Sequence, residues 1–266
     1  MKKLLLAVCL FLPHLATAQS MERGMFTTTP RSGVTQNSFI AGMGGVQAQA
    51  VVLVYNGGYG NINLRMEGGQ PKFNQGSFGV RNRTDFIRNG IQPVLVDVPS
   101  DESRGVSDAY RMSDKQVTDT RAVLAEIRKR AHGMPVFIMT TSRSTLSGAN
   151  LAAALTPEEV AGVVLSSSIS VQAGPGSYSL GTFDFKSVKV PLLIVHHRGD
   201  TCKFTPYRTM AGIGQSFTLI SVSGGKPAES DPCEPQAAHG FYGKEAETTD
   251  AISGWMLKKP FKTEIE

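Results

Sequence analysis

The sequence predicts one α/β domain in which a mostly parallel central sheet carries helices on both faces. Short apolar runs recur along the chain, and near-continuous apolar runs are typical of strands that are buried on both faces. Helical patterns lie between several of these runs, and strands that alternate with helices form parallel sheets. About 248 residues follow a predicted leader, which suits one domain with a sizeable core, and no linker or internal repeat divides them.

The start of the chain has the pattern of a secretory signal peptide. The charged Met1-Lys2-Lys3 precedes an apolar run from Leu4 to Leu12 and the cleavage motif Ala16-Thr17-Ala18. We therefore expect residues 1–18 to be removed and residues 19–266 to form the mature domain. No apolar run is long enough to span a bilayer, so we expect a soluble, periplasmic or secreted protein. The small positive charge is dispersed, which argues against a nucleic-acid partner.

The mature chain is expected to begin with a hairpin beside the main sheet, in which residues 39–41 form a short edge strand. Only about twenty residues separate two later strands, which leaves no room for a large lid domain. Buried strands are expected at 50–55, 91–98, 136–139, 162–166, 190–195 and, as the last strand, 217–222. Helices are expected at 79–89, after the N-cap Ser113, after the central strand, from Thr156 with Pro157 at the first helical position, and at 245–258.

Ser142 lies where the central strand turns into a helix. The apolar run from Pro135 to Met139 breaks into small hydroxyl residues and continues as an Ala/Leu-rich helical pattern. A serine at such a corner projects its Oγ above the sheet, and the following helix directs free N–H groups and its positive dipole end toward a nearby oxyanion. The pattern predicts a nucleophile elbow, although a serine-rich helix N-cap would have the same composition.

Two positions of this elbow depart from the usual G-x-S-x-G, in which glycines keep side chains out of a crowded turn. Thr140 and Ser144 occupy the glycine positions. Ser144 is nearly as small as glycine, but the branched Thr140 requires local repacking.

The strand at 50–55 ends in Asn56-Gly57-Gly58-Tyr59-Gly60. Glycines permit a tight turn and a close approach to a bound group, so this segment is a candidate oxyanion-hole loop, although an ordinary strand-to-loop turn also uses glycines. The expected donors are the N–H of Gly58 or Tyr59 and the N–H of Arg143, which follows the nucleophile.

An acyl-transfer serine needs a histidine to take its proton and a carboxylate to orient that histidine. Asp200 follows the strand at 190–195, and His239 lies on a loop between the last expected strand and the final helix. The order Ser, Asp, His and these positions predict the triad Ser142, Asp200 and His239, with a stray surface histidine as the alternative for His239.

Cys202 and Cys233 are the only cysteines left after the leader is removed. In an oxidising compartment a disulfide is favoured over two free buried thiols. Cys202 lies two residues after Asp200, and Cys233 lies six residues before His239. The bond would therefore tie the loop of the acid to the loop of the base.

With these residues the chain resembles the α/β-hydrolase superfamily over nearly the whole mature length. More narrowly, it is similar to a group of exported bacterial α/β-hydrolases with the elbow G-T-S-R-G-T and an acid strand that ends in V-H-H-x-x-D-x-C. The matching segments here are T-T-S-R-S-T at 140–145 and V-H-H-R-G-D-T-C at 195–202. The resemblance implies an α/β-hydrolase fold, and the two replaced glycines bear on catalytic efficiency rather than on fold.

We therefore expect a serine hydrolase that cleaves a small-molecule ester, thioester or lactone. The alternative is a hydrolase-fold binding protein with weak or no turnover. No cofactor is needed, and a metal site is disfavoured because the adjacent His196 and His197 point to opposite faces of their strand. The guanidinium of Arg143 is expected either to bind a substrate carboxylate or, preferably, to pair with an acidic neighbour such as Asp101.

Overall fold

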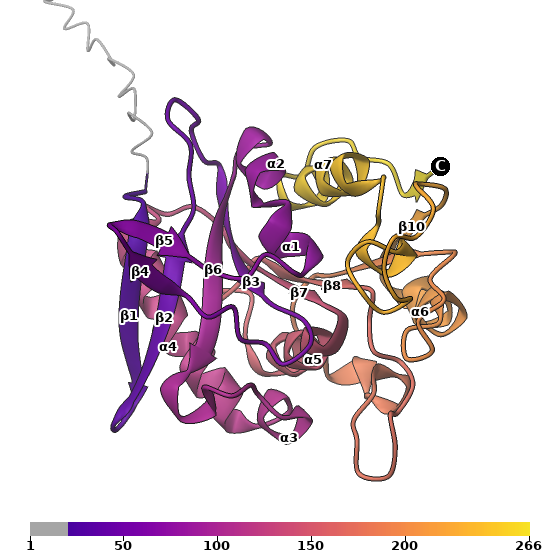
Figure 1. Ribbon diagram of the computed structural model, residues 1–266, viewed down its shortest axis with the longest axis horizontal. Coiled ribbons are helices and arrows are strands. Elements are labelled where there is room, and N and C mark those ends of the chain that lie inside the picture. Colours follow the sequence, from indigo (N-terminus) through magenta and orange to yellow (C-terminus); the bar gives the residue numbers. More distant parts are fainter. Residues whose placement is uncertain (1–20) are drawn as a thin grey trace, which may run out of the picture.

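The computed structural model describes residues 21–266, so the predicted signal peptide, residues 1–18, lies outside the described part. A nine-stranded sheet in the order β1-β2-β6-β3-β7-β8-β9-β10-β11 forms the centre of the molecule (Figure 1). Within residues 21–266, no helix combines the length and the apolar character needed to cross a membrane. The strands of this sheet are β1 (Gly24–Arg31), β2 (Val34–Ile40), β3 (Ala50–Tyr55), β6 (Ile91–Pro99), β7 (Val136–Thr141), β8 (Gly162–Ser166), β9 (Leu192–His197), β10 (Thr218–Val222) and β11 (Glu264–Ile265).

The first two strands form an antiparallel hairpin at one edge of the sheet. β2 also runs antiparallel to β6, whereas the remaining strand pairs of this sheet are parallel. The expected hairpin is confirmed, but its second strand is longer than residues 39–41. Gln36 and Ser38 point to the buried face of β2, so the apolar alternation that normally marks a strand is absent there.

Helices cover both faces of the sheet, which confirms the predicted fold class (Figure 1). Val51 and Leu53 of β3 belong to one apolar layer, and Val52 and Val54 belong to the other, as the two-residue period of a strand requires. The first layer packs against α4 (Asp114–Arg130), α5 (Thr145–Ala154) and α6 (Tyr207–Ile213). The second packs against α1 (Phe78–Arg81), α2 (Arg83–Arg88) and α7 (Glu245–Met256).

Three expected elements differ from the structure. The helix at 79–89 is divided into α1 and α2 at Asn82, whose side chain donates a hydrogen bond to the carbonyl of Phe78. Thr156 begins a single turn rather than a helix, because the chain enters β8 six residues later; within that turn the carboxylate of Glu159 accepts the Thr156 N–H. The strand at 217–222 is not the last, since the short β11 adds to β10. Elements that the sequence did not indicate are the small hairpin of β4 (Arg65–Glu67) and β5 (Gln70–Lys72), α3 (Asp108–Arg111) and α6.

Candidate active site

Ser142 occupies a strained corner at the carboxyl end of β7. Its φ is 57°, in the left-handed region that non-glycine residues rarely adopt. The residue begins a short 3₁₀ turn, Ser142–Ser144, that leads directly into α5. A strained strand-to-helix turn of this kind is the conformation that an elbow needs, and it distinguishes Ser142 from an ordinary N-cap, which has extended backbone angles.

Both replaced glycine positions are buried and hydrogen bonded. Thr140 Oγ1 donates to the carbonyl of Val164 at 2.9 Å, and Ser144 Oγ lies 3.0 Å from the carbonyl oxygen of Tyr55. Ser144 Oγ also accepts the N–H of Thr141 at 2.8 Å. The two hydroxyls therefore connect the elbow to the strands on either side of β7.

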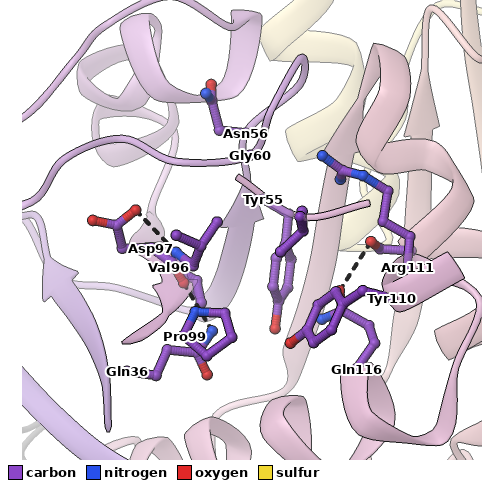
Figure 2. A pocket seen from close by; sticks show the side chains of 13 residues that line it. Gln36, Tyr55, Asn56, Gly60, Val96, Asp97, Pro99, Tyr110, Arg111 and Gln116 are labelled. Carbon is purple, nitrogen blue, oxygen red and sulfur yellow. Dashed lines mark hydrogen bonds between the residues drawn. The ribbon is translucent and has the colours of Figure 1, made fainter. Parts of the chain in front are cut away.

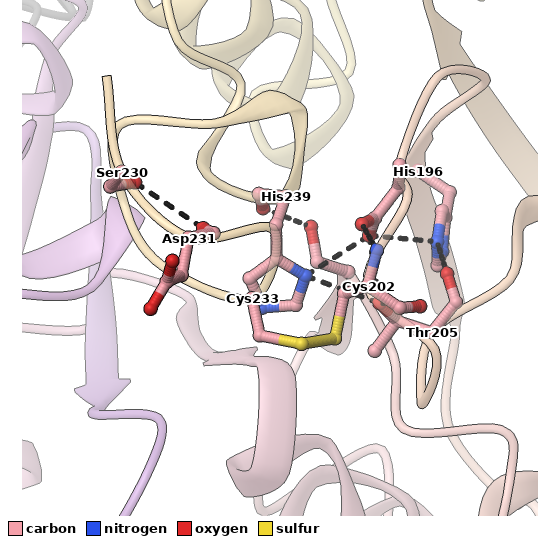
Figure 3. Close-up of a disulfide and its surroundings, with 9 residues drawn as sticks. His196, Cys202, Thr205, Ser230, Asp231, Cys233 and His239 are labelled. Atoms are coloured by element: carbon pink, nitrogen blue, oxygen red, sulfur yellow. Dashed lines mark hydrogen bonds and ion pairs between the residues drawn. A yellow bond between two sulfur atoms is a disulfide. The ribbon is translucent and has the colours of Figure 1, made fainter. Parts of the chain in front are cut away.

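The predicted acid and base, Asp200 and His239, meet beyond β9. His239 Nδ1 lies 3.0 Å from Asp200 Oδ2, and both side chains are buried. Thr205 Oγ1 donates to the same carboxylate oxygen at 2.8 Å and lies 3.2 Å from His239 Nδ1. Figure 3 shows His239 and Thr205 close together beside the disulfide. This arrangement gives Nδ1 the proton and leaves Nε2 able to accept one.

Burial alone would raise the pKa of Asp200, but hydrogen bonds from His196 and His239 outweigh it and hold the pKa well below its ordinary value. The N–H of Cys202 adds a hydrogen bond to Asp200 Oδ1 at 3.0 Å. His196 is fully buried; its Nε2 lies 2.8 Å from the carbonyl oxygen of Thr205 and 3.5 Å from Asp200 Oδ2. Asp200 is therefore ionised and held from several sides.

The second ring nitrogen of His239, Nε2, is buried within the protein. Among residues 21–266, no atom forms a hydrogen bond with the buried Nε2 of His239. The His239 main chain is fixed at the end of β8, the neighbour of β7, because Ser167 Oγ donates to its carbonyl at 2.6 Å. The structure thus joins Asp200 to His239, whereas a hydrogen bond between Ser142 and His239 is not formed within the described chain. The role of Ser142 stays a prediction.

Arg81 of α1 holds the loop of His239 through main-chain contacts. Arg81 Nη2 donates to the carbonyl oxygens of Pro235 and Gly240, on either side of His239. Burial lowers the pKa of Arg81, and Glu245 opposes this effect. Arg81, Thr205 and His196 were not identified from the sequence as parts of the site. Only the V-H-H-x-x-D pattern, which places His196 beside the acid, could have indicated one of them.

The candidate oxyanion loop packs directly against the elbow. A Cβ on Gly57 would lie 2.9 Å from the carbonyl oxygen of Thr141 and 3.2 Å from Ser142 Cβ, so only glycine permits this approach. The N–H of Gly60 closes a turn onto the carbonyl of Gly57 at 2.9 Å. The N–H groups of Gly58 and Tyr59 have no hydrogen-bond acceptor among residues 21–266. They remain candidates for oxyanion donors, together with the N–H of Arg143.

The side chain of Arg143 has an acidic partner, but not the expected one. Its Nε lies 2.7 Å from Asp108 Oδ1, whereas Asp101 accepts hydrogen bonds from Arg31. The expectation of Asp101 is therefore wrong, because Arg31 reaches across from β1 to occupy that carboxylate. The Arg143 side chain is 37% exposed, so its ion pair with Asp108 belongs to the rim of the site.

The structure joins Cys202 and Cys233 by a disulfide (Figure 3). Cys202 is buried beside Asp200, and Cys233 is exposed on the loop that leads to His239. The bond therefore connects the loops of the predicted acid and base.

His197 turns away from this cluster, and its Nε2 lies 3.1 Å from the carbonyl oxygen of Gly224. Within the described part of the chain, no group of three or more His, Cys, Asp or Glu residues is placed to hold a metal ion.

Comparison with solved structures identifies the fold. No protein-family model matches the chain, and no curated protein matches it by sequence. The lidless α/β serine hydrolase XC6422 from Xanthomonas campestris is similar over 90% of this chain and 97% of its own, with a TM-score of 0.59 and 14% identity. Est1E from Butyrivibrio proteoclasticus is similar over 88% of this chain and 98% of its own, again with a TM-score of 0.59 and 14% identity. A sugar hydrolase from Lactococcus lactis gives a TM-score of 0.54 at 15% identity over 88% of this chain and 98% of its own.

Residues 21–266 accordingly have the α/β-hydrolase fold without a large lid, as expected. At such low identity the likeness shows the fold alone, and the chemistry of the site must be argued from this chain's own residues.

Proposed function

We propose that the protein is a serine hydrolase that cleaves a small-molecule ester, thioester or lactone. The observation that carries the proposal is the buried pair of His239 and Asp200. Nε2 of His239 is buried and has no hydrogen-bond partner within the described chain, and the pair lies at the same end of the sheet as the strained Ser142. A histidine held by a carboxylate through one nitrogen, with the other unoccupied, is the arrangement of a general base.

In this mechanism Ser142 Oγ attacks the carbonyl carbon of the substrate while His239 Nε2 takes the hydroxyl proton. The negative oxygen of the tetrahedral intermediate is stabilised by the N–H of Arg143 and by one N–H of the Gly57–Gly60 turn, each worth about 3 kcal/mol. As the intermediate collapses and its C–O or C–S bond breaks, His239 gives the proton to the leaving oxygen or sulfur atom. An ester thus releases an alcohol and a thioester a thiol, and the new hydroxyl of an opened lactone stays on the acyl chain. Water, activated by His239, hydrolyses the acyl-enzyme and restores Ser142.

The ionised Asp200 stabilises the imidazolium that forms in both steps and keeps its ring in one orientation. The Asp200 carboxylate is itself held in place by contacts with Thr205 and His196. We also propose that the protein is exported, because its first 18 residues match a signal peptide and the Cys202–Cys233 bond would persist in an oxidising compartment.

A hydrolase-fold binding protein is the second candidate. It is favoured by the missing hydrogen bond between Ser142 and His239, although catalytic hydrogen bonds are often long or poorly aligned before substrate binds. The enzyme remains the stronger proposal because a binding protein needs neither a strained serine nor a buried acid–base pair.

Labelling with a fluorophosphonate probe separates the two candidates. The wild-type protein should be labelled and should hydrolyse a series of p-nitrophenyl esters of increasing acyl length, whereas Ser142→Ala should do neither. Ser216→Ala is the matched control, because Ser216 is exposed on a turn remote from the elbow, and it should be labelled like the wild type. A folded wild-type protein that is not labelled would establish the binding protein instead.

A further inference from the structure

Arg111 is a buried cation that forms no hydrogen bond to a carboxylate within residues 21–266. Its side chain is 1% exposed and is the largest of the almost fully buried side chains. Burial, followed by the neighbouring cation of Arg143, lowers the pKa of Arg111 to about 10, against the opposing attraction of Asp108. A buried cation that lacks a paired carboxylate costs folding free energy, so stability alone does not account for this residue.

The single hydrogen bond of the Arg111 side chain within residues 21–266 goes to the candidate oxyanion loop. Its Nη2 donates to the carbonyl oxygen of Gly58 at 2.8 Å. The next carbonyl of the same turn, that of Tyr59, accepts the N–H of Val106 at 2.8 Å. The C=O and N–H of a trans peptide point in opposite directions. Because the Gly58 carbonyl is held toward Arg111, the N–H of Tyr59 points away from it.

Arg111 contacts this turn beside a cavity that is too small for a substrate. It lines a cavity of about 20 Å³ together with Tyr55, Asn56 and Gly60 (Figure 2). That volume accommodates roughly one water molecule, so no acyl or leaving group fits there. Arg111 Nε and Asn56 Oδ1 are both buried and have no hydrogen-bond partner within the described chain.

Helix α3 contacts both sides of the candidate oxyanion hole. Arg111 at its end holds the turn of Gly58, and Asp108 at its start pairs with Arg143, the residue after the nucleophile. We infer that Arg111 is a positioning residue for the oxyanion hole, which fixes the Gly58–Tyr59 peptide so that the N–H of Tyr59 faces the reacting carbonyl. This inference rests on the proposed hydrolase function.

Arg111→Met is the decisive variant. Methionine fills similar apolar space, and replacing a buried charge by an apolar side chain is often neutral or stabilising. Gly58 is an exposed residue, so we expect water to replace Arg111 as the hydrogen-bond donor to its carbonyl. We expect the melting temperature to be unchanged or raised, KM to stay within about twofold, and kcat to fall roughly tenfold to a hundredfold through the loosened turn.

Arg111→Lys keeps one charged donor and should recover part of the lost kcat. Arg121→Met is the matched control, because Arg121 lies on α4 in an exposed ion pair with Glu159 and should keep the wild-type kcat. A trifluoromethyl ketone, whose adduct places an oxyanion in the hole, should lose affinity for Arg111→Met in step with kcat, whereas a product carboxylate should not. A wild-type kcat in Arg111→Met would overturn the inference. It would also be overturned if Arg111→Met and Arg111→Lys lost kcat equally and both had a lowered melting temperature.

Hydrogen exchange separates this inference from the proposed function. In the folded protein, peptide N–H groups at residues 57–60 should exchange faster in Arg111→Met than in the wild type, whether or not either protein is active. If the wild type is neither labelled nor active, the proposed function fails, and unchanged exchange in the variant would show that Arg111 does not hold the turn.

Discussion

Thr140 is packed against Gly148, one turn into the helix that follows the nucleophile elbow. A Cβ built on Gly148 would lie 2.5 Å from Thr140 Oγ1 and 2.6 Å from Leu165 Cδ2. The branched residue at an elbow position that usually holds glycine is therefore accommodated by a glycine on α5. The small residue that the crowded turn requires therefore lies on the helix, at Gly148, and not on the strand.

This relationship predicts that Gly148→Ala overpacks the elbow and lowers the free energy of unfolding by about 1–3 kcal/mol. In the Thr140→Ala background the same change should cost about 1 kcal/mol less, because the hydroxyl and one methyl group are gone. Urea unfolding of the four proteins measures this coupling. Gly212→Ala is the control, since a Cβ on that exposed α6 residue meets nothing within 4 Å and alanine favours the helix. Strict additivity of the two changes would refute the packing argument.

The backbone of Ser142 gives a second prediction. At φ 57° a non-glycine residue is strained by about 1–2 kcal/mol, whereas glycine adopts this conformation freely and loses about 0.5–1 kcal/mol in chain entropy. Ser142→Gly should therefore be more stable than Ser142→Ala by up to about 1 kcal/mol, and neither should turn over substrate. Thermal unfolding of the two variants tests this. A less stable glycine variant would show that the elbow is not strained in solution.

Sequence patterns predicted the features that depend on local order along the chain. The central strand, the corner at Ser142, the acid after β9 and the base after β10 all follow from apolar runs, turn residues and their succession. The hairpin at the start was predicted only in part, because Gln36 and Ser38 are polar residues on a buried face.

The supporting contacts could not be predicted, because they join side chains to main-chain groups far away in sequence. Arg111 contacts Gly58 from a four-residue helix with no periodic pattern, and Arg81 contacts the loop of His239 across more than half of the chain. Arg143 was expected to pair with an acidic neighbour such as Asp101, and the tertiary fold places Asp108 there instead. Local pattern thus indicates candidate reactive residues, and tertiary contacts specify what holds them.

The lowered pKa of Asp200 predicts a pH-dependent contribution to stability. A carboxylate whose pKa is lower in the folded state stabilises the fold fully above its ordinary value of 3.8, and the contribution is lost as pH falls below that value toward the lower folded pKa. The free energy of unfolding of the wild type minus that of Asp200→Asn should therefore decrease steadily between about pH 5 and about pH 3. Urea unfolding across this range measures the difference, and a constant difference would mean that Asp200 is not held as an ion.

The Cys202–Cys233 disulfide is expected to support the active site more than the fold. Cys202 donates its N–H to Asp200, and Cys233 lies on the exposed approach to His239, whereas the apolar layers on both faces of the sheet do not depend on this bond. Closing a loop with a sequence separation of 31 residues stabilises a fold by about 3.7 kcal/mol, which corresponds to roughly 7–15 °C in melting temperature.

The double variant Cys202→Ser/Cys233→Ser should keep a native-like circular dichroism spectrum and melt lower by about that amount. Its turnover should fall on the order of tenfold or more, because a displacement of about 1 Å between acid and base costs up to a hundredfold in rate. Treating the wild type with a reductant should lower its rate in the same way, while a reduced sample of the double variant serves as the control for direct effects of the reagent. Full activity in the double variant, or two free thiols in the exported protein by mass spectrometry, would contradict the role of this bond in holding Asp200 against His239.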